Sequence, residues 1–233
     1  MSEKSTLLIS KLVIEFEKQS NETKAIQMKA YMRNQYKFYG IPSPQRKEIT
    51  KKIIGSTSFN TFKELESFLH ECLKKEEREW SYVALDTLLQ FKKNWTIESI
   101  HFIEFFLLKN TWWDTLDLLS ANVVGPYFKC FPETKSHWIE KWLASENFWL
   151  NRVCIIFQLK YKNETDYLLL TDSILLFKES NEFFVQKAIG WALREISKHN
   201  PQFVINFTNQ YEIKPLSKRE ALRILIKKFI ISP

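Results

Sequence analysis

Apolar residues along this chain recur mainly three and four positions apart, which is the spacing of one face of an α-helix. Strict alternation of apolar and polar residues, the pattern of a half-buried strand, is rare. Helix starts are marked by Ser43 before Pro44 and by Pro132, Pro201 and Pro215, each of which follows a short loop. The sequence therefore predicts an all-α protein.

Segments that open on an aromatic residue recur at a nearly constant interval. They begin at Trp80, Trp113, Trp149 and Phe184, which lie 33, 36 and 35 residues apart, and a further step of 35 in each direction reaches Gln45 and Arg219. A period near 35 with only helices between is typical of an α-solenoid of stacked antiparallel helix pairs, that is, HEAT-like repeats. A non-repetitive helical bundle is the alternative. We expect one domain over residues 1–233, curved so that its helices form a concave groove.

The predicted helix from Glu182 to about Lys198 has two different faces. One face is an ordinary core stripe of Val185, Ile189, Ala192, Leu193 and Ile196. The other carries aromatic rings and cations, namely Phe183, Phe184, Lys187, Trp191, Arg194 and Lys198. Gly190 lies on this second face, where its missing side chain would let a ligand approach closely. Such a face can bind phosphates between aromatic platforms. Alternatively, the rings pack on a neighbouring helix while the cations lie at a wet edge.

A second candidate is the pair Trp113 and Asp117, which are four residues apart and hence neighbours on one helical face. A core tryptophan beside an acidic residue near a helix N-terminus would explain the spacing. The alternative is an aromatic wall beside a carboxylate, which suits a cationic substrate because a ring face attracts a cation. Spacing leaves both interpretations open.

Three further residues are candidates for contacts with an anionic ligand or a groove. Arg152 could grip a phosphate through its planar guanidinium, and Lys160 follows it two helical turns later. Arg152 could equally be a surface arginine. Tyr31 is either a groove residue or a stem that packs on the first helices.

The balance of charge favours an anionic partner. Lys and Arg number 34 against 27 Asp and Glu, which gives a net charge of +7. Such an excess favours nucleic acid or an anionic membrane surface, although a solvated basic surface would also explain it. No run approaches the roughly 20 apolar residues of a membrane span, and no secretory signal opens the sequence.

The sequence gives no indication of a metal or cofactor. Cys72, Cys130 and Cys154 match no zinc or disulfide spacing, and the four histidines are scattered. Cys130 and Cys154 have apolar neighbours and are expected in the core, as small residues of a protein of the reducing cytoplasm. Gly-rich phosphate loops, nucleophile elbows, HExxH and CxxC are all lacking.

These segments resemble the AlkD-type alkylpurine DNA glycosylases, which are built from HEAT-like repeats. The resemblance extends over nearly the whole chain. It is carried by Tyr31-Met-Arg-Asn, Tyr39-Gly-Ile-Pro-Ser-Pro-Gln-Arg, Trp112-Trp-Asp-Thr-Leu-Asp, Trp149-Leu-Asn-Arg, Phe157-Gln-Leu-Lys-Tyr, Glu182-Phe-Phe-Val-Gln-Lys-Ala-Ile-Gly-Trp-Ala-Leu-Arg-Glu and Pro215-Leu-Ser-Lys-Arg-Glu.

The resemblance implies roles for individual residues. Asp117 would be the catalytic carboxylate, with Trp113 and Trp191 as the aromatic walls of the lesion site. Arg152 would contact a backbone phosphate near the lesion. The remaining residues implied to line the groove or to contact DNA are Tyr31, Phe183, Phe184, Arg194 and Lys160.

The resemblance also implies an activity: hydrolysis of the N-glycosidic bond of cationic N3- or N7-alkylated purines in double-stranded DNA, with the damaged base left in the duplex. We expect a cytoplasmic monomer without a cofactor, bound to DNA through a basic groove and to no membrane. Two other functions stay open at this point: a non-catalytic DNA-binding scaffold of the same architecture, and a protein-binding solenoid.

Overall fold

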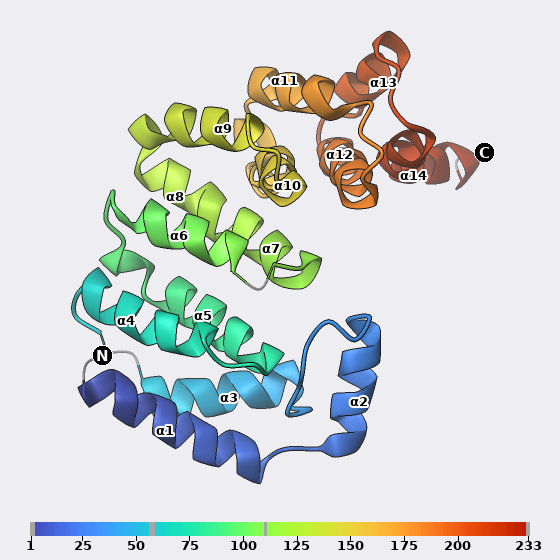
Figure 1. The fold of residues 1–233 in the computed structure, drawn as a ribbon. Coiled ribbons are helices and arrows are strands. Elements are labelled where there is room, and N and C mark those ends of the chain that lie inside the picture. The colour runs from blue at the N-terminus through green and yellow to red at the C-terminus, as the bar shows by residue number, and fades with distance from the viewer. Residues whose placement is uncertain (1–2, 56–58, 110, 232–233) are drawn as a thin grey trace. The chain divides into compact units, whose positions relative to one another are not determined.

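The computed structural model describes residues 3–55, 59–109 and 111–231, with side chains up to residue 227. Helices account for its regular structure, and the pairing of Lys37 with Glu77 is an isolated bridge outside any strand of the described residues. The predicted all-α class is confirmed. The chain divides into two compact units, Met1–Asn110 and Thr111–Pro233 (Figure 1). The expectation of one domain stays a prediction.

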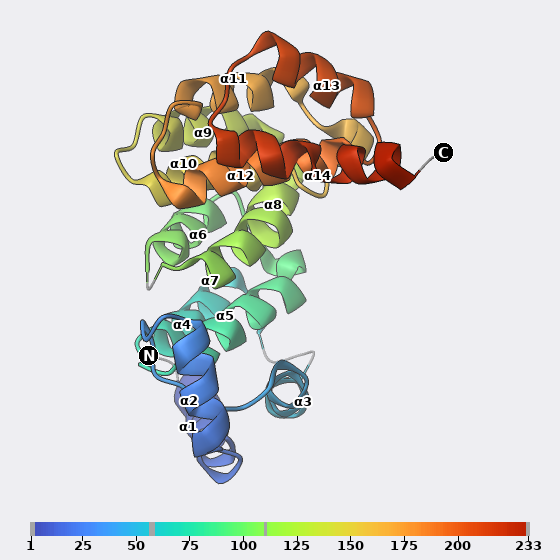
Figure 2. The same ribbon diagram turned by 90° about the vertical axis from the view of Figure 1, so that its right-hand side faces the viewer.

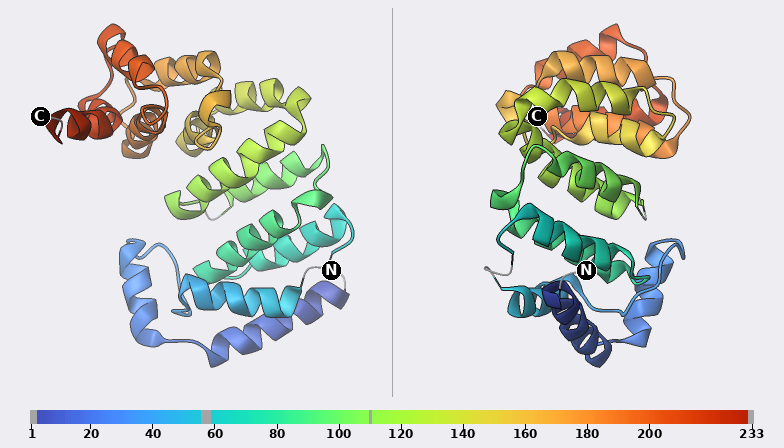
Figure 3. Two further views of the ribbon diagram at one scale, coloured as in Figure 1. Left: turned by 180° about the vertical axis from the view of Figure 1, so that it is seen from behind. Right: turned by 60° about the vertical axis from the view of Figure 1, so that its left-hand side comes forward.

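The unit Met1–Asn110 is a layered set of helices. Its α-helices are α1 (Glu3–Lys18), α2 (Glu22–Tyr31), α3 (Ser43–Ile54), α4 (Phe62–Leu73), α5 (Arg78–Gln90) and α6 (Ser99–Leu108). α1 packs on α3 and α4, and α5 packs on both of these (Figure 3). The core of this unit contains side chains that are fully excluded from solvent, among them Leu12, Phe16, Leu65, Phe68 and Trp80.

The unit Thr111–Pro233 holds the remaining helices. They are α7 (Trp113–Leu119), the π-helical turn η2 (Ser120–Val124), α8 (Gly125–Cys130), α9 (Lys135–Leu143), α10 (Phe148–Ile156), α11 (Tyr167–Phe177), α12 (Phe183–Ile196), α13 (Pro201–Gln210) and α14 (Pro215–Ile231), with 3-10 turns at Pro132–Thr134 and Lys162–Glu164. α10 packs against α12, and α12 packs against α14 along much of its length (Figure 2). Ile155, Ile174, Ile189, Leu193 and Val204, on α10 to α13, belong to the buried hydrophobic cluster of this unit.

The period found in the sequence corresponds to the second helix of successive pairs. Its members lie near the starts of these helices: Gln45 in α3, Trp80 in α5, Trp113 in α7, Trp149 in α10, Phe184 in α12 and Arg219 in α14. Hydrogen bonds join residues one period apart, as where Gln90 Nε2 donates to the Gly55 carbonyl at 2.7 Å. Residues about 35 positions apart are therefore neighbours in space, as expected for stacked repeats.

The environment of Cys130 differs from the expectation. Cys154 is buried in α10 as predicted, whereas Cys130 is exposed. Cys130 is the last residue of α8, and it is Tyr127 and Phe128 that bury the apolar side of that helix. Apolar neighbours in the sequence are therefore not sufficient to predict that this cysteine is buried.

Gly190 serves the packing of two helices and not the approach of a ligand. A Cβ at this position would lie 2.5 Å from the Cβ of Glu220 and 2.8 Å from the Ser217 carbonyl oxygen, both on α14. Gly190 is itself buried. The expectation that this glycine opens α12 to a ligand is therefore wrong, because it is α14 that makes the close approach.

This close contact predicts that replacing Gly190 by alanine, a change that usually stabilises a helix, lowers the stability of this protein. In an open helix, Gly190→Ala would gain about 1 kcal/mol from helix propensity. Here we expect a net loss of about 1–3 kcal/mol in the free energy of unfolding, because the added methyl group overpacks the α12–α14 contact. Urea denaturation measures this difference. A midpoint equal to or above that of the wild type would contradict it.

Candidate active site

An ion pair between α7 and α10 is the centre of the site. Arg152 Nε donates to Asp117 Oδ1 at 2.8 Å, and Nη2 donates to Oδ2, also at 2.8 Å. The Arg152 side chain is 4% exposed and that of Asp117 is 15% exposed. Two parallel charge-assisted hydrogen bonds fix the plane of the carboxylate as well as its position. Asp117 is therefore held rigidly while part of it still reaches the surface.

The same guanidinium also reaches a third helix. Arg152 Nη1 donates a hydrogen bond to the backbone carbonyl of Phe184, in the first turn of α12. Arg152 therefore ties together α7, α10 and α12, which belong to three successive repeats. In this structure the guanidinium donates hydrogen bonds to Asp117 and to the Phe184 carbonyl. The contact with a DNA phosphate that the family resemblance implies for Arg152 stays a prediction.

A local change in helix geometry follows Asp117. The helix that begins as α7 widens into the π-turn Ser120–Val124 before it continues as α8. Pro126 in the first turn of α8 lacks an N–H, and a proline ring excludes the carbonyl four residues earlier. The wide turn accommodates this proline, and such turns often lie beside functional residues.

The surroundings of Asp117 act on its charge in opposite directions. Burial raises the pKa of Asp117, the hydrogen bonds and charge of Arg152 lower it, and the charge of Asp114 raises it, which leaves the pKa above that of a free aspartate. The ionised carboxylate thus depends on Arg152 to offset the cost of burial.

Aromatic rings gather at the first turns of the same three helices. The ring centroids of Trp149 and Phe184 are 4.7 Å apart, those of Trp112 and Phe184 are 5.4 Å apart, and those of Trp112 and Trp149 are 5.8 Å apart. Sequence reasoning overlooked Trp112 as part of this cluster, although the ring stands next to Trp113 in the N-cap position of α7. Phe184, a predicted groove residue, contacts both tryptophans of this cluster and is half-buried.

The two tryptophans predicted as lesion walls are both half-buried. Trp113 opens α7 one helical turn before Asp117. Trp191 lies in the middle of α12 and packs against the buried cluster of its unit. Both side chains are therefore partly accessible to solvent.

The predicted cations of α12 have a carboxylate partner that the helical wheel could not reveal. Lys187 Nζ lies 2.9 Å from Glu220 Oε1, and Arg194 is paired with the second oxygen of the same carboxylate. The hydrogen bond from Lys187 is the largest effect that lowers the pKa of Glu220. Because Glu220 belongs to α14, this neighbouring helix partly neutralises the basic face of α12. Lys187 comes before Trp191 in the sequence and Arg194 comes after it.

The remaining predicted residues are accessible. Lys160 is exposed and its Nζ donates to Oδ1 of Asn122, while Phe183 is 51% exposed. Tyr31 is 70% exposed at the end of α2 and belongs to the other unit. The structure thus brings Asp117, Arg152 and Phe184 into contact and leaves the roles of Tyr31, Phe183 and Lys160 as predictions.

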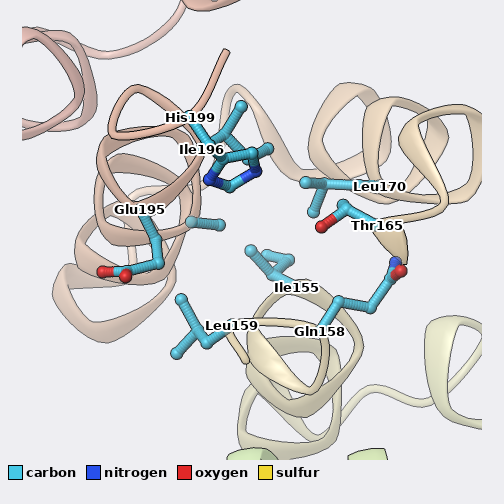
Figure 4. A pocket seen from close by; sticks show the side chains of 9 residues that line it. Ile155, Gln158, Leu159, Thr165, Leu170, Glu195, Ile196 and His199 are labelled. Atoms are coloured by element: carbon cyan, nitrogen blue, oxygen red, sulfur yellow. The ribbon is translucent and has the colours of Figure 1, made fainter. Parts of the chain in front are cut away.

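A small cavity in the same unit is a gap in the core and not a second site. Ile155, Leu159, Leu170 and Ile196 supply much of its lining, with Gln158, Thr165, Ala192, Glu195 and His199 completing it (Figure 4). Three of the polar lining groups already have partners: Gln158 Oε1 accepts from the Asp166 N–H, Thr165 Oγ1 donates to the Lys162 carbonyl and Glu195 pairs with Lys198.

The described residues form neither a metal-binding cluster nor a membrane-spanning helix. Among them, no three His, Cys, Asp or Glu side chains gather closely enough to hold a metal ion. In the same part of the chain, no helix combines the length and apolar character needed to cross a membrane.

The fold and the site define an all-helical repeat protein that holds an aspartate beside clustered tryptophans. A family described as "DNA alkylation repair enzyme" matches residues 12–225, and the chain belongs to this family. A solved structure described as a predicted DNA alkylation repair enzyme from Enterococcus faecalis is 33% identical, with a TM-score of 0.83 over 90% of this chain and 98% of that one. The match confirms the α-solenoid of helix pairs, while the concave basic groove stays a prediction. A comparison with curated proteins gave no significant match.

The ion pair predicts a specific effect of removing its cation. We expect Arg152→Met to raise the pKa of Asp117 further, because burial then acts without the guanidinium that opposes it. Unfolding should become easier by about 3–5 kcal/mol, the usual cost of breaking a buried pair. The pKa is measured by NMR titration of carboxyl-labelled aspartate.

Arg152→Lys is the matched variant, since it keeps the charge and loses the two-pronged geometry. It should raise the pKa of Asp117 less than Arg152→Met does. An unchanged pKa in the methionine variant would contradict the account.

Proposed function

We propose that this protein is an AlkD-type DNA glycosylase that removes cationic N3- or N7-alkylated purines from double-stranded DNA. The observation that carries the proposal is the carboxylate of Asp117, fixed by two hydrogen bonds from Arg152 and partly open to solvent. Membership of the DNA alkylation repair family supports DNA as the substrate. In this proposal the protein acts as a monomer in the cytoplasm and needs no cofactor.

The proposed chemistry suits a single ionised carboxylate. A purine alkylated at N3 or N7 is already cationic, and it therefore leaves without protonation, unlike the leaving groups of ordinary glycosidases. As the bond from C1′ to nitrogen breaks, positive charge develops on the deoxyribose. Asp117 stabilises this charge and orients a water molecule whose oxygen bonds to C1′, while the water's proton passes to solvent.

The aromatic residues have a second role in the proposal. Trp113 and Trp191 contact the lesion, because the face of an indole attracts a cation by about 0.5–2 kcal/mol. Phe183, Phe184 and Tyr31 each contact the DNA. Following the family resemblance, the base is released without being flipped out of the duplex, so that no closed pocket must enclose it.

A non-catalytic DNA-binding scaffold is the second candidate, and one observation favours it. Arg46 and Asp86 form a similar ion pair, with Nη2 3.0 Å from Oδ2, in the unit that lacks Asp117. An aspartate–arginine pair can therefore join two helices of this fold without a catalytic role. The two functions are separated by whether Asp117 is needed for base release.

The decisive substitution is Asp117→Asn. It keeps the size of the side chain and removes the charge that stabilises the sugar, so we expect release of 7-methylguanine or 3-methyladenine to fall by at least about 100-fold. Binding to duplex DNA should change little. Release is followed by chromatography of the freed bases from methylated duplex DNA.

Asp166→Asn is the matched control, because Asp166 is an ion-paired aspartate of the same unit and asparagine still caps its helix. It should release bases at the wild-type rate. Full activity of Asp117→Asn, or no release by the wild type from any cationic lesion, would favour the scaffold.

The pH dependence of base release gives an independent measure of the same carboxylate. Only ionised Asp117 stabilises the sugar cation, and burial holds its pKa above the ordinary value. The rate should therefore decline with falling pH sooner than it would for a free aspartate, and Arg152→Lys should move the decline to higher pH. Spontaneous release without enzyme is subtracted at each pH. A rate that stays constant down to about pH 3.9, the free aspartate value, would contradict this.

A further inference from the structure

An open hollow lies between α3 and α5, within the unit Met1–Asn110. It measures about 520 Å³ and is lined by Lys47, Thr50, Lys51, Gly55, Asp86 and Gln90. None of these residues belongs to the site around Asp117, which lies in the other unit.

Thr50 is an unusual feature of this hollow. The residue is 4% exposed, and its hydroxyl Oγ1 is buried without a hydrogen-bond partner. Two other buried helical threonines bond to the carbonyl four residues earlier: Thr87 to Val83 at 2.7 Å and Thr208 to Val204 at 3.0 Å. A buried polar group without a partner is costly, which points to a partner supplied from outside the protein.

The side chain of Arg46, near Thr50, also has a buried polar atom without a hydrogen-bond partner. Arg46 lies one helical turn before Thr50 on α3 and is 6% exposed, and its Nε has no partner although Nη2 bonds to Asp86 at 3.0 Å. Two buried donors without partners thus lie four residues apart on α3. Both are suited to an acceptor-rich ligand or to water.

The charges around the hollow favour an anion. Lys47 and Lys51 are exposed on α3 and four residues apart, so that they line the same side of the helix. The carboxylate of Asp86 is paired with Arg46 at 3.0 Å and lies 3.7 Å from Lys47 Nζ. Three cations (Arg46, Lys47 and Lys51) against one acid (Asp86) leave a net charge of +2.

We propose that this hollow binds a phosphodiester of the DNA backbone. Lys47 and Lys51 bind the phosphate charge, and the Thr50 hydroxyl donates a hydrogen bond to one phosphate oxygen. A contact of this kind fixes the position of the protein on the duplex without reading base or lesion. The inference rests on DNA as the substrate, and it does not depend on the cleavage chemistry assigned to Asp117.

The test measures binding to an unmodified DNA duplex by fluorescence anisotropy at several salt concentrations. Lys47→Gln and Lys51→Gln should each weaken binding about five- to tenfold at 0.1 M salt, and the variant with both substitutions should reduce the slope of log affinity against log salt by about 0.9, the value for one phosphate contact. Lys63→Gln is the matched control, because Lys63 is an exposed lysine of α4 in the same unit. It should leave both the affinity and the slope unchanged.

Thr50→Val separates a ligand-binding hydroxyl from a structural one. Valine has the same shape, and the hydroxyl that it removes has no partner within the protein. We expect weaker DNA binding, by about fivefold for one lost hydrogen bond, with an unchanged salt slope and a melting temperature equal to or above that of the wild type. Thr87→Val should do the opposite, because the buried Thr87 hydroxyl bonds to Val83: a lower melting temperature and unchanged DNA binding.

Three outcomes would overturn the proposal. Lys47→Gln and Lys51→Gln could bind DNA like Lys63→Gln, or Thr50→Val could bind DNA like the wild type. Inorganic phosphate could raise the melting temperature of the wild type but not of Thr50→Val while DNA binding of all variants stays equal, which would identify a free oxyanion as the ligand. Failure of base release alone would remove the proposed glycosylase activity and leave this phosphate site standing.

Discussion

The two hydrogen bonds from Arg152 to Asp117 are the contact on which the rest of the site depends. Burial of the carboxylate favours its neutral form, and the guanidinium opposes that preference in part, which leaves the pKa of Asp117 above that of a free aspartate. The third hydrogen bond from Arg152, to the carbonyl of Phe184, holds the cation in place from α12. One arginine thereby sets both the charge and the orientation of the aspartate.

Stacking of repeats explains how residues distant in the sequence meet here. Asp117 and Arg152 are separated by 35 positions, and Phe184 follows after 32 more. The same separation recurs where Lys129 pairs with Glu164 and where Gln90 bonds to Gly55. Each repeat contacts mainly its neighbours, and residues about 35 positions apart in the sequence are therefore expected to be in contact.

Helical spacing, proline positions and the aromatic period were enough to predict the helix pairs, because each helix must bury one apolar face. The face of Trp113 and Asp117 was also predictable. A helical wheel names no partner helix, however, and so it could not reveal that Arg152 would bind Asp117 or that Glu220 would pair with Lys187. For the same reason Gly190 was assigned to a ligand although α14 covers it. Such pairings follow from the register between helices, which local sequence does not contain.

The charge state of Asp117 restricts what the proposed site can do. The guanidinium donates two hydrogen bonds to the Asp117 carboxylate and favours its ionised form, which makes the residue poorly suited to donate a proton to a leaving group, although burial leaves its pKa above that of a free aspartate. The ionised carboxylate is well suited to stabilise positive charge on a sugar. In the proposed reaction the substrate must then bring its own good leaving group, which a cationic alkylated purine does and a neutral base does not. Selection of damaged DNA would thus arise from the leaving group, and the backbone contacts could remain indifferent to the lesion.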